Sequence, residues 1–291
     1  MKPPVFQYHQ PQTIEQVVAL LGSLENGRLL AGGQSLMPML NMRYAMPDHV
    51  IDLNRVAGLA SIALDGGELR IGAMTRQRDI EFSAEIARVC PIMVEAIRHV
   101  GHRQTRNRGT IGGSLCHLDP SAELVTICAL HDATVSAVGP TGRRDIPFSA
   151  FVAGYMTSSL KPDECLTEVR IPLWPPGHGY GFVEFARRHG DFAIVSAAAL
   201  IELSRGGTIA RAALALGGVG PAPLRLAAVE ASLAGKMPAD EVWADAAAAC
   251  ATIEPLDDIH ASSAYRRRLA VVMAQRALQA AGARALAARP H

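Results

Sequence analysis

The sequence has few cysteines, few aromatic residues and almost no net charge. Its five cysteines among 291 residues include no C-x-x-C pair. An odd number of cysteines without such pairs is typical of a reducing compartment, and it excludes an iron–sulfur cluster or a structural zinc site built by this chain alone. A net charge of +1 argues against nucleic acid as a partner.

Long apolar runs and targeting signals are also missing. No run approaches the ~18 residues that a membrane span needs, and the most apolar stretch, FAIVSAAALIEL (192–203), fits a buried strand better. The N-terminal MKPPVFQYHQPQ lacks the apolar segment of a signal peptide. We therefore expect a cytoplasmic protein without a membrane span.

Signatures of catalysis and metal binding are absent as well. The ten histidines form no H-x-x-x-H or H-E-x-x-H pattern. The acidic residues show no carboxylate pair arranged for acid–base catalysis. Ser114 lies in GGSL rather than G-x-S-x-G, which argues against a hydrolase nucleophile. The sequence predicts no catalytic side chain and no metal site.

The pattern of apolar residues predicts an α+β fold in two domains. We place the boundary in LWPPGHGYG (173–181), which holds two prolines and three glycines. The first domain would span residues 1–175, with a β-α-β unit in 1–56 and a β-rich subdomain in 57–175. The second would span residues 176–291, with a three-stranded antiparallel sheet and then helices.

Local signals place the elements within these domains. Thr13 is expected to cap the first helix. Hairpins are expected to turn at Asp65-Gly66-Gly67, at 139–142 and at Gly206-Gly207. The expected strands are 28–32, 49–53, 61–74 and 133–147 (a hairpin each), 181–188, 192–204 and 208–219. The expected helices are 13–27, 35–42, 83–100, 224–235, 239–252 and 262–286.

Two glycine corners organise the first domain: a first corner, Ala31–Leu36, and a second corner, Thr110–Ser114. LLAGGQSLMPML (29–40) runs from a strand into Gly-Gly, Ser and a helix, and RNRGTIGGSLCHLDPSAE (106–123) repeats that order after a strand-like approach. Glycine lets the backbone approach a ligand, and successive N–H groups at a turn before a helix can bind an anion. The corners suggest two sides of one phosphate-bearing ligand, although neither is the G-x-G-x-x-G of a Rossmann fold.

The residues after the second corner add polar groups. Asp119 is expected to cap a helix that starts at Pro120, with Glu123 in its first turn. A carboxylate there suits the hydroxyls of a ribityl or ribose chain, but acidic residues also favour helix N-termini on electrostatic grounds alone. His117 is either a ligand contact or an ordinary loop histidine.

Two arginine-rich stretches have two interpretations each. The basic loop His102–Arg108 is either a solvated surface or a source of ligand contacts through Arg106 or Asn107. The run Arg266–Arg268 is either a solvated helix face or a docking surface for a partner.

Four stretches together resemble one family. LLAGGQSLMPMLNMR, QTRNRGTIGGSLCHLDPSAEL, ALGGVGPAPLR and YRRRLAVVMAQRAL look like the FAD-binding medium subunit of the molybdenum hydroxylases. That group includes carbon monoxide dehydrogenase, aerobic N-heterocycle dehydrogenases and the flavin domain of xanthine dehydrogenase. The resemblance covers essentially the whole chain. It implies FAD as the cofactor, with residues 1–175 as the FAD-binding domain and 176–291 as the C-terminal flavoprotein domain.

The resemblance also implies which residues contact the cofactor. The two corners would hold the pyrophosphate and the ribityl chain, with Glu123 where the family usually has Asp. Leu166 matches a position beside the adenine. Phe192 matches an apolar residue against the flavin ring, unless it fills the core of its own domain. The implied binding residues are Ala31, Gly32, Gly33, Gln34, Ser35, Leu36, Thr110, Ile111, Gly112, Gly113, Ser114, His117, Glu123, Leu166 and Phe192.

The function that follows from the resemblance is electron transfer. The substrate would be oxidised on a large subunit with the molybdenum cofactor, and a small subunit with two [2Fe-2S] clusters would carry the electrons to the FAD of this chain. An external acceptor would receive them. The assembly would be a dimer of heterotrimers, and the substrate an N-heteroaromatic compound or carbon monoxide. The alternatives are a stand-alone FAD-dependent oxidoreductase and a non-redox nucleotide-binding assembly protein.

Overall fold

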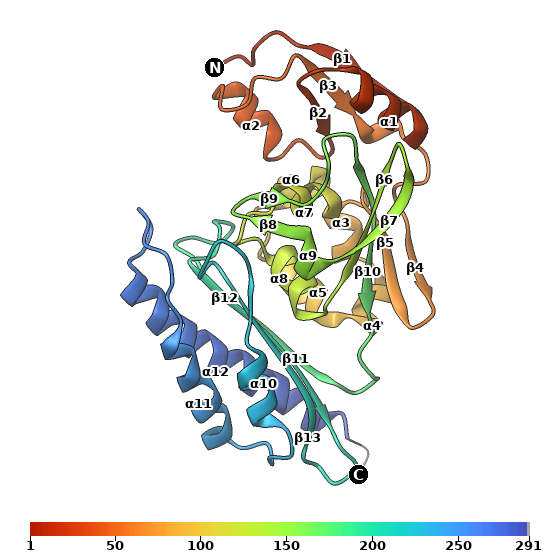
Figure 1. Cartoon of the computed structure of the whole chain (residues 1–291). Helices are drawn as coiled ribbons and strands as arrows, with labels where there is room; N and C mark the ends of the chain where they lie inside the picture. Colours follow the sequence, from red (N-terminus) through yellow and green to blue (C-terminus); the bar gives the residue numbers. More distant parts are fainter. Residues whose placement is uncertain (290–291) are drawn as a thin grey trace.

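Three β-sheets of three, five and four strands, each with its own helices, follow one another along the chain in the computed structural model, which describes residues 1–289 (Figure 1). A further sheet of only two strands belongs to the middle part of the chain. The N-terminal sheet lies at one end, the five-stranded sheet in the middle, and the C-terminal sheet with its long helix at the other end. The expected α+β fold is confirmed. Among the described residues, no helix is both long enough and apolar enough for a membrane span.

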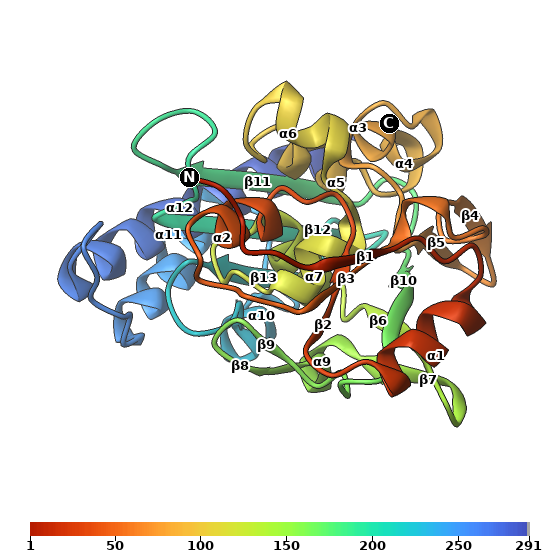
Figure 2. The same cartoon turned by 90° about the horizontal axis from the view of Figure 1, so that it is seen from above.

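The N-terminal sheet is parallel throughout, in the order β1-β3-β2. Strand β2 leads through the first corner and α2 into β3, as the β-α-β prediction requires, and α1 and α2 lie on opposite sides of the sheet (Figures 1 and 2). Thr13 caps α1 as expected, since its hydroxyl accepts a hydrogen bond from the Gln16 N–H at 3.3 Å. The elements are β1 (Gln7–His9), α1 (Ile14–Ser23), β2 (Gly27–Leu30), α2 (Leu36–Asn41), β3 (His49–Asp52) and the 3-10 helix η1 (Leu53–Arg55).

The middle sheet is antiparallel, in the order β4-β5-β10-β6-β7, with both predicted hairpins present. Its central strand, β10, was not among the predicted elements, and it joins the two hairpins across the sheet. Its strands are β4 (Ile62–Asp65), β5 (Glu68–Gly72), β6 (Thr134–Gly139), β7 (Gly142–Pro147) and β10 (Cys165–Pro172). Strands β8 (Val152–Gly154) and β9 (Thr157–Ser158) pair with each other in a separate two-stranded sheet. The helices are α3 (Gln77–Glu81), α4 (Ala84–Val89), α5 (Pro91–Ile97), α6 (Arg103–Arg108), α7 (Ile111–His117), α8 (Glu123–Leu130) and α9 (Phe148–Phe151).

Three predictions about the middle helices are wrong. The single helix expected over 83–100 is broken at Cys90, because Pro91 has no N–H and restricts the residue before it. The second corner is preceded by helix α6 rather than by a strand, so His102–Arg108 is mostly helical. Helix α8 starts at Glu123, not at Pro120, because the Asp119 carboxylate accepts the Ser121 N–H at 2.9 Å in a turn that comes before the helix.

The C-terminal sheet is antiparallel, and the Gly206-Gly207 hairpin joins β12 to β13 as predicted. A fourth strand, β14, takes two residues that were assigned to a helix. One face of the sheet packs against the middle helices through residues such as Ala198 and Ala215, and the other packs against α12. The elements are β11 (Gly179–Phe185), β12 (Val195–Leu203), β13 (Ile209–Gly217), β14 (Leu224–Arg225), α10 (Ala227–Leu233), α11 (Asp240–Ala248), the 3-10 helix η2 (Ala249–Thr252) and α12 (Ser263–Ala287).

The run Arg266–Arg268 is not the exposed face that the sequence predicted. Arg266 is only 4% exposed, Arg267 is half-buried, and Arg268 alone is exposed. Arg266 lies on the side of α12 that faces the sheet, together with Ala270 and Met273. A guanidinium in such a place needs several hydrogen-bond partners, and the two terminal nitrogens of Arg266 have three acceptors, whereas its Nε has none among the described residues.

Candidate functional site

The first corner presents a row of unpartnered backbone N–H groups. Among the described residues, the five N–H groups from Gly32 to Leu36 donate to no acceptor. Gly33 has φ of +74°, a left-handed conformation that turns the chain from β2 into α2 and that glycine adopts without strain. Ser35 precedes α2, and its hydroxyl makes no capping hydrogen bond. Successive free N–H groups at the start of a helix form a binding site for an anion.

The two glycine corners contact each other. A Cβ added to Gly32 would overlap the carbonyl oxygen of Arg108, and one added to Gly113 would lie 3.5 Å from the Ala31 Cβ. The chain segments that lead into the two corners are therefore packed backbone against backbone. This agrees with the expectation that both corners line one site.

Asn54 and Arg76 connect the two corners through hydrogen bonds, and neither residue was among the predicted site residues. The Asn54 side-chain amide donates to the Ala31 carbonyl at 3.1 Å. The Arg76 guanidinium donates to the Arg108 carbonyl and to the Asn54 side-chain oxygen. Asn54 lies in the short 3-10 helix η1 and Arg76 directly precedes α3, so no periodicity or motif marks them.

The second corner differs from the first, because its N–H groups are already bonded. Those of Ile111 and Gly112 donate to the carbonyls of Thr75 and Ala73 at 3.2 and 2.8 Å. The Gly113 N–H donates to the Thr110 hydroxyl at 3.1 Å, which makes Thr110 the N-cap of α7. Thr110, Ile111 and Gly112 are buried, whereas Gly113, Ser114 and His117 are half-buried. The second corner therefore offers side chains, not a backbone nest.

Glu123 is a buried carboxyl at the start of α8. It is 4% exposed. Burial, with smaller contributions from the neighbouring charges of Glu184 and Asp119, raises the pKa of Glu123 to about 8. Hydroxyl groups of a ligand would give this carboxyl the hydrogen-bond partners that burial denies it.

Replacing Glu123 with glutamine is expected to stabilise the FAD-free protein at alkaline pH. The ordinary pKa of the group is 4.5 and its pKa in the folded protein is about 8. The contribution of the protonated Glu123 to the free energy of unfolding is therefore lost as pH rises from 4.5 through about 8. E123Q cannot ionise and escapes this loss. The melting temperature of E123Q minus that of the wild type should increase between about pH 5 and about pH 8.5. The same substitution at exposed Glu241, in the first turn of α11, is the control, and a constant difference for E123Q would contradict the prediction.

The two remaining predicted residues lie in very different places. Leu166 is 3% exposed and packs in the core of the middle sheet, so only its main chain can face a ligand. Phe192 is 57% exposed, in the connection between β11 and β12. The alternative that Phe192 fills the core of its own domain is wrong. The connection packs beside the turn before α6, where a Cβ added to Gly190 would lie 2.8 Å from the His102 ring.

Arg106 is occupied by structural contacts. Its guanidinium bonds both carboxylate oxygens of Glu81, at 2.8 and 3.2 Å, and the Val100 carbonyl at 3.0 Å. These contacts hold the α6 segment against α3. Asn107 is exposed.

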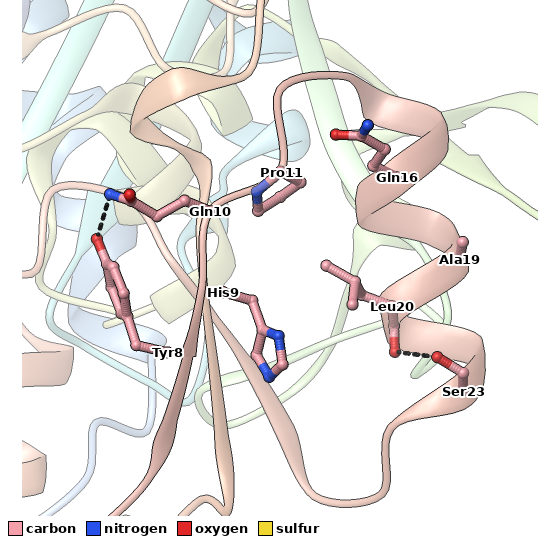
Figure 3. A pocket seen from close by; sticks show the side chains of 8 residues that line it. All are labelled: Tyr8, His9, Gln10, Pro11, Gln16, Ala19, Leu20 and Ser23. Atoms are coloured by element: carbon pink, nitrogen blue, oxygen red, sulfur yellow. Dashed lines mark hydrogen bonds between the residues drawn. The ribbon is translucent and has the colours of Figure 1, made fainter.

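An open hollow of about 560 Å³ lies between β1 and α1, away from both corners (Figure 3). Both polar and apolar side chains line it, and none of them belongs to a predicted site residue. The lining residues are Tyr8, His9, Gln10, Pro11, Gln16, Ala19, Leu20 and Ser23. In the part of the chain that the structure describes, no group of three or more His, Cys, Asp or Glu side chains could hold a metal ion.

A backbone nest between the first strand and the helix of a parallel β-α-β unit, a buried acid and an exposed aromatic ring are the features of a protein that binds a dinucleotide cofactor. Comparison with known proteins defines that class further. Residues 4–174 match the family described as the FAD binding domain in molybdopterin dehydrogenase, and residues 180–281 match the CO dehydrogenase flavoprotein C-terminal domain. The chain belongs to this family of molybdenum hydroxylase flavoproteins.

Individual relatives agree with this assignment over nearly the full length. The chain is 38% identical to the 6-hydroxypseudooxynicotine dehydrogenase complex subunit alpha of Paenarthrobacter nicotinovorans, over 96% of this chain and 95% of that one. It is 37% identical to the carbon monoxide dehydrogenase medium chain of Hydrogenophaga pseudoflava, over 98% and 99%. A chain of quinoline 2-oxidoreductase from Pseudomonas putida 86 superposes with a TM-score of 0.94 at 35% identity, over 98% and 100%.

The predicted class of protein is thereby confirmed. The chain is an FAD-binding medium subunit of a molybdenum hydroxylase, an oxidoreductase subunit that works with small and large partner subunits. The stand-alone oxidoreductase and the non-redox assembly protein are not favoured by these relatives. The residues that contact FAD stay a prediction.

Proposed function

We propose that this chain holds FAD between its two glycine corners and passes electrons from the iron–sulfur clusters of a partner subunit to an external acceptor. One observation carries the proposal: the row of free N–H groups from Gly32 to Leu36, beside a second corner that is packed against it. FAD, when bound, supplies the redox chemistry, so the protein has to bind, orient and shield it. A protein that binds a redox cofactor in this way needs no general base of its own, and the sequence predicts none.

Each predicted residue has a role in this proposal that its position supports. The first corner, Ala31–Leu36, binds the pyrophosphate through its N–H groups and the Ser35 hydroxyl. Thr110, Gly112 and Gly113 hold the turn in shape, with Ile111 anchoring it in the core, and Ser114 and His117 face the ligand. Glu123 accepts hydrogen bonds from ribityl or ribose hydroxyls. The main chain at Leu166 lies beside the adenine, and Phe192 lies against the flavin ring.

The proposed assembly contains this chain, a small subunit with two [2Fe-2S] clusters and a large subunit with the molybdenum cofactor, as a cytoplasmic dimer of heterotrimers. Within this chain, residues 1–175 form the FAD-binding domain and residues 176–291 the C-terminal flavoprotein domain. The substrate is an N-heteroaromatic compound or carbon monoxide, as the names of the relatives suggest. It is chosen on the large subunit, so this chain does not select between the two.

Reconstitution tests the proposal directly. The purified chain is incubated with FAD, desalted and examined for flavin absorbance, and about one FAD per chain is expected. A chain that stays colourless would overturn the proposal. Native mass and the metal content of the complex purified with its partners then test the assembly, since molybdenum and iron are expected in the complex and not in this chain.

A further inference from the structure

Arg266 joins two backbone segments that flank the candidate site. Its Nη1 donates to the Ile194 carbonyl at 2.5 Å and to the Gly218 carbonyl at 2.7 Å. Its Nη2 donates to Asp258 Oδ2 at 2.6 Å. Two of the three partners are main-chain carbonyls at the ends of neighbouring strands, where β12 begins and β13 has just ended.

The first of these partners, the Ile194 carbonyl, lies at the end of the connection that contains Phe192. Ile194 is two residues beyond Phe192, and its own N–H donates to the Phe185 carbonyl at 2.8 Å, where β11 ends. These two hydrogen bonds fix the base of the connection from Ala186 to Ala193. Phe192 itself is exposed and has no core packing to hold it, so its direction is determined by this backbone.

The Gly218 partner connects the same guanidinium to the segment that leads into Glu123. The Gly218 N–H donates to the Pro120 carbonyl at 2.9 Å, three residues before Glu123. Gly218 lies so close to Ile194 that an added Cβ would be 2.7 Å from the Ile194 carbonyl oxygen. One buried side chain thus relates Phe192, in the connection between β11 and β12, to Glu123 at the start of α8, and both are predicted to contact FAD.

Asp258 completes the arrangement from the other side. Its Oδ1 accepts the N–H groups of His260 and Ala261 at 2.8 and 3.0 Å. That turn reaches the Phe192 connection again, because Arg187 donates to the Ile259 and His260 carbonyls at 3.3 and 3.1 Å. Replacing a buried ion pair with apolar side chains often costs a protein no stability. We therefore infer that the buried arginine serves to hold the loop carbonyls, to which it is bonded, in fixed positions.

We propose that Arg266 is a positioning residue that, through the Ile194 and Gly218 carbonyls, holds Phe192 at the flavin ring and so limits the access of small oxidants such as oxygen. The inference rests on the proposed place of Phe192 beside the flavin. Arg266 does not touch the cofactor and acts only through the connection that it fixes.

The test compares R266M, R266K and F192A in the FAD-loaded full chain, with R268M as the control on the exposed side of the same helix. FAD content, melting temperature and the rate at which oxygen reoxidises the chemically reduced protein are measured. We expect R266M to retain FAD and to be reoxidised severalfold faster than the wild type, and we expect the same of F192A. The reoxidation rate of R266K should lie between those of R266M and the wild type. The double variant R266M/F192A should be no faster than F192A alone, and R268M should match the wild type.

The outcomes separate this inference from the proposed function. A lower melting temperature of R266M with unchanged reoxidation would make Arg266 merely structural and overturn the inference. Faster reoxidation of R266M together with an unchanged rate in F192A would overturn the claim that Arg266 acts through Phe192. If R266M does not fold, D258N removes only one of the three partners, and its reoxidation should shift in the same direction; an unchanged rate in soluble D258N would then count against the inference. Failure of the wild-type chain to bind FAD would instead overturn the proposed function.

Discussion

A chain in which Gly33 is replaced by valine is expected to fold and to lose FAD. Gly33 has φ of +74°, where a β-branched residue is strained by roughly 1–3 kcal/mol. An added Cβ would also lie 3.1 Å from Met37 Cγ and 3.3 Å from Leu30 Cδ1, so the turn must shift. A shift turns the N–H groups from Gly32 to Leu36 away from a common point. Each hydrogen bond lost to a charged phosphate costs about 1.5–3 kcal/mol, or roughly 12- to 160-fold in affinity, so the loss of two or more should lower FAD affinity about 100-fold or more.

A matched control separates the ligand effect from the strain. Gly58 has φ of +77°, and a Cβ added there meets no atom within 4 Å. G58V should therefore lower the melting temperature as G33V does and keep its FAD. FAD titration of both variants by flavin fluorescence makes the measurement. If G33V binds FAD as the wild type does, the first corner is only a turn.

Gly113 gives a less direct test of the second corner. A Cβ added there would lie 2.8 Å from the Thr110 hydroxyl oxygen, which caps α7. Valine at Gly113 would therefore disturb the helix as well as any ligand. The first corner gives the more direct test, because its N–H groups make no hydrogen bonds within the described part of the protein.

The features that local chemistry decides could be predicted from the sequence. Thr13 caps its helix through its own hydroxyl, and glycine pairs turn the hairpins, so both appear where the pattern indicated. The first corner follows from the same kind of signal, because a strand, two glycines and a helix in series require a left-handed residue such as Gly33.

What the sequence could not provide depends on contacts between distant residues. The two corners look alike in sequence, yet only the second is paired to the segment of Ala73 and Thr75, which takes its N–H groups. Strand β10 is central because one strand from each of two earlier hairpins, β5 and β6, pairs with it on either side. Arg266 is buried because carbonyls 72 and 48 residues away converge on it, and a run of three arginines carries no sign of that.

Phe192 shows where the structure narrows a choice that the sequence left open. DFAIVSAAAL reads as a continuous buried strand, which would put the ring in the core. The strand β12 begins only at Val195, and the residues before it form an exposed connection. A ring that is 57% exposed, on a connection with a fixed base, is available to a ligand or to a partner.

Replacing Phe192 with alanine is expected to leave the fold unchanged and to alter the reactivity of the flavin. Loss of a ring packed on the isoalloxazine removes roughly 0.5–1.5 kcal/mol of stacking, or about 2- to 12-fold in FAD affinity. That is far less than the loss expected for G33V, so F192A should still be purified with FAD. The uncovered ring face should then react with oxygen severalfold faster.

Stopped-flow reoxidation of the reduced, FAD-loaded chain by oxygen measures that rate, and F192L, which retains an apolar side chain of similar volume, serves as the graded comparison. Phe82 is 64% exposed on the middle helices and lies at none of the predicted contacts, so F82A controls for removal of an exposed ring. We expect the order F192A, then F192L, then F82A and wild type together, with all four melting temperatures alike. Unchanged reoxidation in F192A at full FAD content would show that Phe192 lies away from the flavin, and its exposed ring would then be assigned to contact with a partner subunit.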